Sequence, residues 1–187
     1  MRRTAFLLFI LPLATFASDP AEDTATIAGD SKVRSAEFRD LKKHLSGTWV
    51  GRFTNATLED PAEWKPVEVR YLSSANGSAI IENYFFGDAR EPGMTTVYYP
   101  DGAELELTHY CGAQNHPRMQ STAYDQASRT YSFEFLDITN LHDESDYHSR
   151  SLDLRFVTDD NVQIVYSGEV DGRTAVQSYD LVRKTED

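Results

Sequence analysis

The chain has 187 residues, of which 40% are hydrophobic and 12% aromatic, and its 18 basic and 30 acidic side chains give a formal net charge of −12 at pH 7. A chain of this length is expected to form one domain with its own core. The acidic charge repels nucleic acid and anionic membrane surfaces, so we predict neither as a partner. The only cysteine, Cys111, excludes an intramolecular disulfide, so stability has to come from packing.

The first residues have the pattern of an export signal. Arg2 and Arg3 precede a long, almost uninterrupted apolar run, and small residues lead up to Ala17. The run is shorter than the roughly 20 residues that a membrane-spanning helix needs. We therefore predict a signal peptide over residues 1–17, export to the periplasm or the cell exterior, and no membrane anchor after cleavage. Loss of Arg2 and Arg3 would leave 16 basic against 30 acidic residues, a net charge of −14.

A leader and a short helix are predicted next. Residues 18–34 are small, polar and acidic, which is typical of a flexible segment. Phe38, Leu41 and Leu45 then recur at helical spacing, and a glycine follows that can end the helix. We expect this helix to open a single domain over residues 35–187.

After the helix, the hydrophobic period changes from 3.6 to 2 and keeps that value to the end of the domain. Ten strands are predicted, over residues 48–54, 67–73, 78–86, 94–99, 104–111, 117–124, 130–136, 149–157, 162–168 and 174–183. Asn76-Gly77 and Asp171-Gly172 supply the positive backbone φ that two-residue hairpin turns require. The short connections exclude crossover helices, so neighbouring strands should pair in antiparallel fashion. Because closure removes exposed sheet edges, we predict an all-β fold, a closed antiparallel up-and-down barrel of about 8 to 10 strands with a short N-terminal helix.

Two ends of the predicted barrel carry a resemblance to the lipocalins. Gly47-Thr48-Trp49 on the first strand resembles the Gly-x-Trp that opens the lipocalin and wider calycin barrels, and Arg183 stands where their closing arginine lies. The resemblance implies that the indole fills the barrel floor and makes a cation–π contact with the guanidinium. The alternative is an ordinary core tryptophan and a surface arginine.

A second resemblance covers nearly the whole chain after the leader. The run Thr-His-Tyr-Cys at 108–111, followed by Asn-x-Pro-Arg-Met at 115–119, is similar to the hallmark of a family of exported, largely bacterial proteins without an assigned activity. Further similarity lies at 45–51, 96–98, 101–102 and 137–141. The resemblance implies a lipocalin-like barrel of unknown ligand and supplies no reaction.

The hallmark segment also holds the candidate site. Alternation along the strand turns His109 and Cys111 toward the core and Glu106 toward solvent. We expect Asn115 and Arg118 to project back over the same barrel mouth, where they would grip an anionic or carbonyl-bearing molecule together with His109. The predicted ligand-binding set is His109, Asn115 and Arg118, with an apolar wall of Trp49, Tyr131, Phe133 and Phe135. The structural alternative has the asparagine bonding within its own turn and the arginine pinning a loop through Asp137.

Three functions remain open on this evidence. The first is a monomeric, exported barrel that binds a small, partly apolar molecule. The second is a small enzyme, an isomerase or hydrolase, with His109 as general acid or base and Arg118 stabilising negative charge. The third is a filled barrel whose acidic loops bind another protein. We predict no cofactor and no metal.

Three other chemical readings are weaker. Cys111 and His109 could form a nucleophile and its base, but no orienting group or oxyanion donor is indicated, and a buried, inert thiol is favoured. His109 could bind haem, as a histidine does in nitrobindin-type barrels, although no haem motif is present. Residues 142–148 are rich in metal-ligand side chains, but their spacing fits neither an EF-hand nor a zinc site, which favours a solvated acidic loop.

Overall fold

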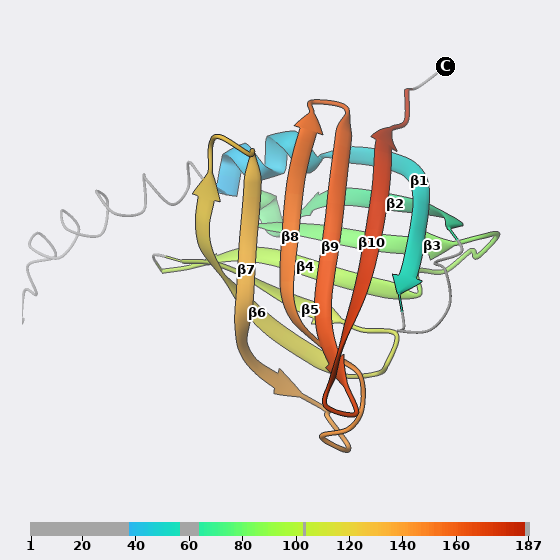
Figure 1. The fold of residues 1–187 in the computed structure, drawn as a ribbon. Helices are drawn as coiled ribbons and strands as arrows, with labels where there is room; N and C mark the ends of the chain where they lie inside the picture. Colours follow the sequence, from blue (N-terminus) through green and yellow to red (C-terminus); the bar gives the residue numbers. More distant parts are fainter. Residues whose placement is uncertain (1–37, 57–63, 103, 186–187) are drawn as a thin grey trace, which may run out of the picture.

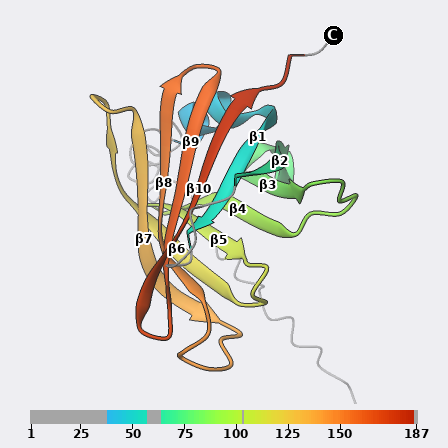
Figure 2. The same cartoon turned by 45° about the vertical axis from the view of Figure 1, so that its right-hand side comes forward.

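Ten antiparallel strands close into a barrel in the part of the chain that the computed structural model describes, residues 38–56, 64–102 and 104–185. The strands are β1 (Gly47–Ala56), β2 (Lys65–Ser74), β3 (Ala79–Phe86), β4 (Met94–Asp101), β5 (Glu104–Tyr110), β6 (His116–Asp125), β7 (Thr130–Thr139), β8 (His148–Thr158), β9 (Asn161–Val170) and β10 (Arg173–Arg183). Each strand pairs with its neighbours in the chain, and β1 lies beside β10 to close the ring (Figure 2). The predicted fold class is confirmed, whereas the predicted signal peptide and leader lie outside the described residues.

Both glycine-containing turns have the positive φ that the sequence predicts. Asn76 and Gly77 have φ of 55° and 88°, within the short 3-10 turn η1 (Ala75–Gly77) between β2 and β3. Asp171 and Gly172 have φ of 49° and 67° between β9 and β10. Asp171-Gly172 forms the predicted two-residue hairpin, because Val170 pairs with Arg173 on either side of it. The β2–β3 turn is longer than predicted, since Ser74 pairs with Ala79 and Ala75 also has a positive φ, of 49°.

A helix closes one end of the barrel, which we call the floor. Residues 38–45 form this helix, which Figure 1 draws in blue across the upper end of the strands. The Trp49 indole, fully buried, donates from Nε1 to the carbonyl of Leu45 at 2.8 Å. The Arg183 guanidinium lies 4.2 Å from the centre of the Trp49 ring and donates to the carbonyls of Ser46 and His44 at 2.6 and 2.9 Å. The contact implied by the lipocalin resemblance is therefore present, and it ties the helix end to the last strand.

Replacing Arg183 with methionine should lower the free energy of unfolding by about 2 kcal/mol, because helix-end carbonyls lose their donor and the indole loses its cation. Urea denaturation followed by the fluorescence of Trp49 and Trp64 measures this change. Arg173→Met on the same strand is a suitable control, since that arginine is exposed and makes only a 3.8 Å contact with Asp171. An equal decrease in the free energy of unfolding of both variants would mean that the contact at the floor does not stabilise the protein beyond an ordinary surface arginine.

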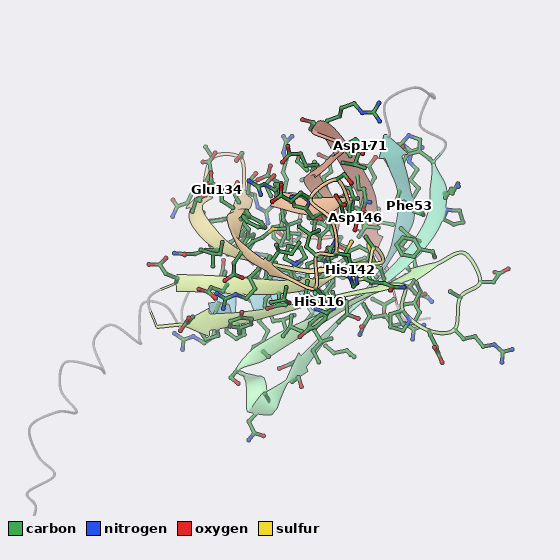
Figure 3. All side chains as sticks on the ribbon, turned by 90° about the horizontal axis from the view of Figure 1, so that it is seen from below. Phe53, His116, Glu134, His142, Asp146 and Asp171 are labelled. Carbon is green, nitrogen blue, oxygen red and sulfur yellow. The ribbon has the colours of Figure 1, made fainter. Side chains whose placement is uncertain are left out.

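The opposite end of the barrel, which we call the mouth, carries the loops at residues 87–93, 111–115, 140–147 and 171–172. The β1–β2 connection also belongs to this end, and its residues 57–63 lie outside the described part. Figure 3 shows the barrel from the mouth end, with Phe53 on β1 and Asp146 and Asp171 on loops. Within the described residues, no helix has the length and apolar character to cross a membrane.

Candidate functional site

A cavity of about 510 Å³ lies inside the mouth. Its wall is mainly aromatic and apolar and includes Phe53, Phe86, Met94, Ala175 and Tyr179. The rings form one continuous surface, because Phe53 lies 4.7 Å from Phe86 and 5.7 Å from Tyr179 between ring centres. Volume and lining are those of a small-molecule pocket, which is typically 300–1,000 Å³ and predominantly apolar.

A few polar groups reach the same cavity. The Tyr179 hydroxyl donates to Gln177 Oε1 at 3.2 Å, and the Tyr147 hydroxyl lies 3.3 Å from Ser149 Oγ. Cys111 Sγ accepts from the backbone N–H of Ala113 at 3.5 Å. Burial raises the pKa of the Cys111 thiol above its usual value, so the thiol stays protonated at neutral pH. The cavity therefore offers neutral hydrogen-bonding groups on an aromatic wall.

On the floor side of the cavity, a row of polar side chains crosses four adjacent strands. Tyr71 of β2 pairs with Glu82 of β3, Glu82 pairs with Thr96 of β4, and Thr96 pairs with His109 of β5. Residues paired directly across a sheet present their side chains on the same face. All four side chains are buried in the barrel, with exposed fractions of 2% or less.

The Glu82 carboxylate is the centre of this row. Tyr71 and Tyr84 donate their hydroxyls to Oε1, and Tyr98 and Tyr166 donate to Oε2, the last at 3.4 Å. Burial raises the pKa of Glu82 above its usual value, while the hydrogen bonds from its neighbours oppose that shift. The four phenols replace the hydration shell of the carboxyl group with protein donors, so its buried oxygens are satisfied.

His109 ends the row and contacts the opposite wall of the barrel. Its Nδ1 lies 2.9 Å from Thr96 Oγ1, and its ring centre is 4.7 Å from that of Tyr166 on β9. Burial lowers the pKa of His109 from 6.5 to about 3, so the imidazole is neutral at physiological pH. The predicted burial of His109 is confirmed, with 1% of its surface exposed.

One aromatic layer separates the buried carboxylate from the cavity. The Tyr179 ring, which lines the cavity, lies 5.0 Å from the ring of Tyr84, and Tyr84 donates to Glu82 at 2.9 Å. Tyr166, another ligand of the carboxylate, has its ring centre 6.3 Å from that of Tyr179. The interior is thus filled toward the floor and open at the mouth.

Arg118 does not join this site, so the prediction that it reaches over the same mouth as His109 is wrong. It pairs across β5 and β6 with Thr108, and alternation places Thr108 on the outer face of the barrel. The guanidinium makes a two-pronged ion pair with Asp137, each N–H to oxygen distance being 2.9 Å, and Glu106 lies 3.7 Å away. The structural alternative, a guanidinium pinned through Asp137, describes the observed contact.

Asn115 is 1% exposed and supports the mouth without lining the cavity. Its Nδ2 donates to the carbonyl of Tyr147 at 2.7 Å, which holds the β7–β8 loop, and its backbone carbonyl accepts from Cys111 at 3.0 Å. The asparagine therefore fixes two segments that do line the cavity, Tyr147 and the turn that starts at Cys111.

The four predicted wall aromatics lie elsewhere in the barrel. Trp49 is at the floor, and Tyr131 donates to Asp40 of the floor helix at 3.0 Å. Phe133 packs in the core against Tyr98, and Phe135 lies under the guanidinium of Arg150, 4.3 Å from the ring centre. The predicted ligand-binding set is therefore not brought together in one pocket.

The geometry does not assemble the catalytic pairs or the metal site that the sequence left open. His109 is neutral and buried inside the barrel, whereas Arg118 on the neighbouring strand β6 faces outward. The pair proposed for acid–base catalysis is therefore not assembled. No hydrogen bond joins Cys111 to His109 among the described contacts, and the thiol instead contacts the Ala113 N–H. Across the described residues, no group of three or more histidine, cysteine, aspartate or glutamate side chains is placed to hold a metal ion.

Sequence reasoning missed Glu82 and its phenols, although a signal was present. Ile80, Glu82 and Tyr84 alternate on β3, and alternation that turns the isoleucine inward turns the glutamate inward as well. Tyrosines on the inward phase of neighbouring strands are the donors that such a carboxylate needs. The cavity wall at Phe53 and Tyr179 was missed because these two residues meet through the pairing of β1 with β10, which the local sequence does not reveal.

Comparison with known proteins supports the fold alone. No known protein family and no curated protein matches the sequence. Among solved structures, Rv2717c from M. tuberculosis has a TM-score of 0.55 at 14% identity, over 79% of this chain and 98% of that one. A protein of unknown function from the DUF3598 family of Nostoc punctiforme has a TM-score of 0.44 at 10% identity, over 75% of this chain and 48% of that one. The first similarity is that of one barrel to another, and neither lipocalin membership nor the hallmark family is established by it.

Proposed function

We propose that this protein is an exported, monomeric, lipocalin-like barrel that binds a small, largely apolar molecule in the cavity at its mouth. The observation that carries the proposal is the cavity itself, about 510 Å³ with a continuous aromatic wall inside an otherwise packed barrel. Export is supported by the sequence of residues 1–17, which lies outside the described part, and the lipocalin-like assignment by the contact between Trp49 and Arg183.

The ligand differs in one respect from the one that the sequence predicts. With Arg118 held on the outer face by Asp137, none of the described residues that line the cavity offers a guanidinium to an anion. The polar groups available to a ligand are the hydroxyls of Tyr147 and Tyr179, the amide of Gln177 and the thiol of Cys111. A molecule with an apolar body and one or two hydrogen-bonding groups fits this chemistry.

Filling the cavity should abolish binding. Ala175 lies on the cavity wall with 2% of its surface exposed, and phenylalanine at this position would occupy the space that the ligand needs. Nile red, a neutral apolar dye, should bind the wild-type protein with enhanced fluorescence, and Ala175→Phe should weaken that binding at least about tenfold.

The control is Val176→Phe, one residue along the same strand, where the side chain faces away from the cavity. This variant should bind Nile red like the wild type. Absence of saturable binding to the wild type, or equal binding by both variants, would contradict the proposed function.

A further inference from the structure

We infer, on the basis of the proposed function, that the cavity selects organic cations, substituted ammonium groups with an apolar body, over neutral and anionic molecules of the same size. Three independent features of the mouth favour positive charge: the ring faces that line it, the acidic group of Glu82 on its floor side and the acidic loops around it.

The cavity wall presents aromatic rings and no competing charge. Phe53, Phe86, Tyr147 and Tyr179 contribute to it, and within the described part of the chain none of the twelve lining residues is charged. A cation over an aromatic face is attracted by the negative charge density of the ring, and the attraction strengthens when water is excluded. An anion in the same place would meet the same ring faces unfavourably and would find no basic side chain among the described lining residues.

The carboxyl group of Glu82 lies under this wall and is an acidic group without a basic partner among the described residues. The ring of Tyr84, whose hydroxyl donates to Glu82, lies 5.0 Å from the ring of Tyr179 on the cavity wall. The phenols that hold the carboxylate are all directed at it, and the described lysine and arginine side chains form none of its hydrogen bonds or ion pairs.

The loops of the mouth carry a net negative charge, which also favours cations. The four described loops at 87–93, 111–115, 140–147 and 171–172 contain six acidic residues and one arginine. At the floor, the helix and the described loops contain three acidic and four basic residues, so the negative charge is concentrated at the open end. Such an asymmetric field attracts cations to the mouth and disfavours anions there.

The test compares three molecules that share a six-carbon chain and differ in the head group: hexyltrimethylammonium, 1-hexanol and hexyl sulfate. Each is titrated into the full-length mature protein loaded with Nile red, and displacement of the dye gives its affinity. The ammonium should bind at least about tenfold more tightly than the sulfate and more tightly than the alcohol. The preference over the sulfate should shrink as salt is added, because salt screens the exposed acidic loops.

Two variants separate the sources of the preference. Phe86→Leu keeps an apolar side chain but removes a ring face, so it should weaken binding of the ammonium several-fold more than binding of the alcohol. Glu82→Gln should weaken binding of the ammonium selectively as well, because it removes the acidic group on the floor side of the aromatic wall. If Glu82→Gln does not fold, the salt dependence and Phe86→Leu still decide the question.

The outcomes are distinct. If hexyl sulfate or 1-hexanol binds as tightly as the ammonium while Nile red is displaced, cation selectivity is overturned and the proposed function stands. If Nile red does not bind the wild type and none of the three molecules binds in calorimetry, both are overturned. If Phe86→Leu prefers the ammonium over the alcohol as strongly as the wild type does, the role of the aromatic wall is contradicted.

Discussion

Replacing Glu82 with leucine should destabilise the barrel more than any other single change considered for this protein, lowering the free energy of unfolding by at least about 4 kcal/mol. The substitution leaves Tyr71, Tyr84 and Tyr98 with hydroxyls that lie in the packed interior and have lost the acceptor they share. Each buried donor left without a partner costs about 1–3 kcal/mol. Urea denaturation monitored by far-ultraviolet circular dichroism measures the loss.

Two comparisons show whether the missing acceptor is the cause. Glu82→Gln keeps one carbonyl oxygen and should lose much less stability than Glu82→Leu. Exchanging Tyr71, Tyr84 and Tyr98 for phenylalanine in the Glu82→Leu background removes the stranded hydroxyls and should recover a large part of the loss, because apolar replacement of a whole buried polar network is often nearly neutral. The external control is Glu134→Gln on β7, an exposed glutamate that should change stability little. A Glu82→Leu protein as stable as the control would show that the network contributes nothing.

The parts of the fold that were predictable are those set by local pattern. Alternation placed all ten strands, and the positive φ of Asn76-Gly77 and Asp171-Gly172 followed from the residue types in those turns. The burial of His109 followed from the same alternation. The contact between Trp49 and Arg183 came from a resemblance, and its physical basis is the pairing of the two residues across β1 and β10.

The site was less predictable because it depends on register between strands. Whether Arg118 faces the interior is decided by its pairing with Thr108, and a β-bulge immediately after Arg118 shifts the remaining β6–β7 register. Local sequence does not fix either feature. The position of the cavity also depends on where the floor helix packs. That helix closes one end of the barrel, and the rings of Phe53 and Tyr179 line the cavity at the other end.

The buried histidine should make the protein sensitive to acid. Burial lowers the pKa of His109 from 6.5 to about 3, so between these values the unfolded chain binds a proton that the folded barrel does not. Stability contributed by the neutral imidazole is therefore complete above pH 6.5 and falls as the pH drops through this window. At pH 4.5 the loss should be about 2–3 kcal/mol, on the order of 1.4 kcal/mol for each pH unit below 6.5.

The comparison of His109→Asn with the wild type isolates this effect. Asparagine can hydrogen-bond to Thr96 but does not titrate, so the variant should be less stable than the wild type at pH 7 and close the gap by about 2–3 kcal/mol at pH 4.5. Glu82 acts in the opposite direction, because its raised pKa makes the folded state bind the extra proton above pH 4.5, but it is present in both proteins and cancels to first order. His142→Asn, on the exposed β7–β8 loop, should follow the wild-type curve. A constant stability difference between His109→Asn and the wild type from pH 7 to pH 4.5 would mean that the imidazole takes up its proton in the folded barrel as it does in the unfolded chain, and that His109 is not held neutral by burial.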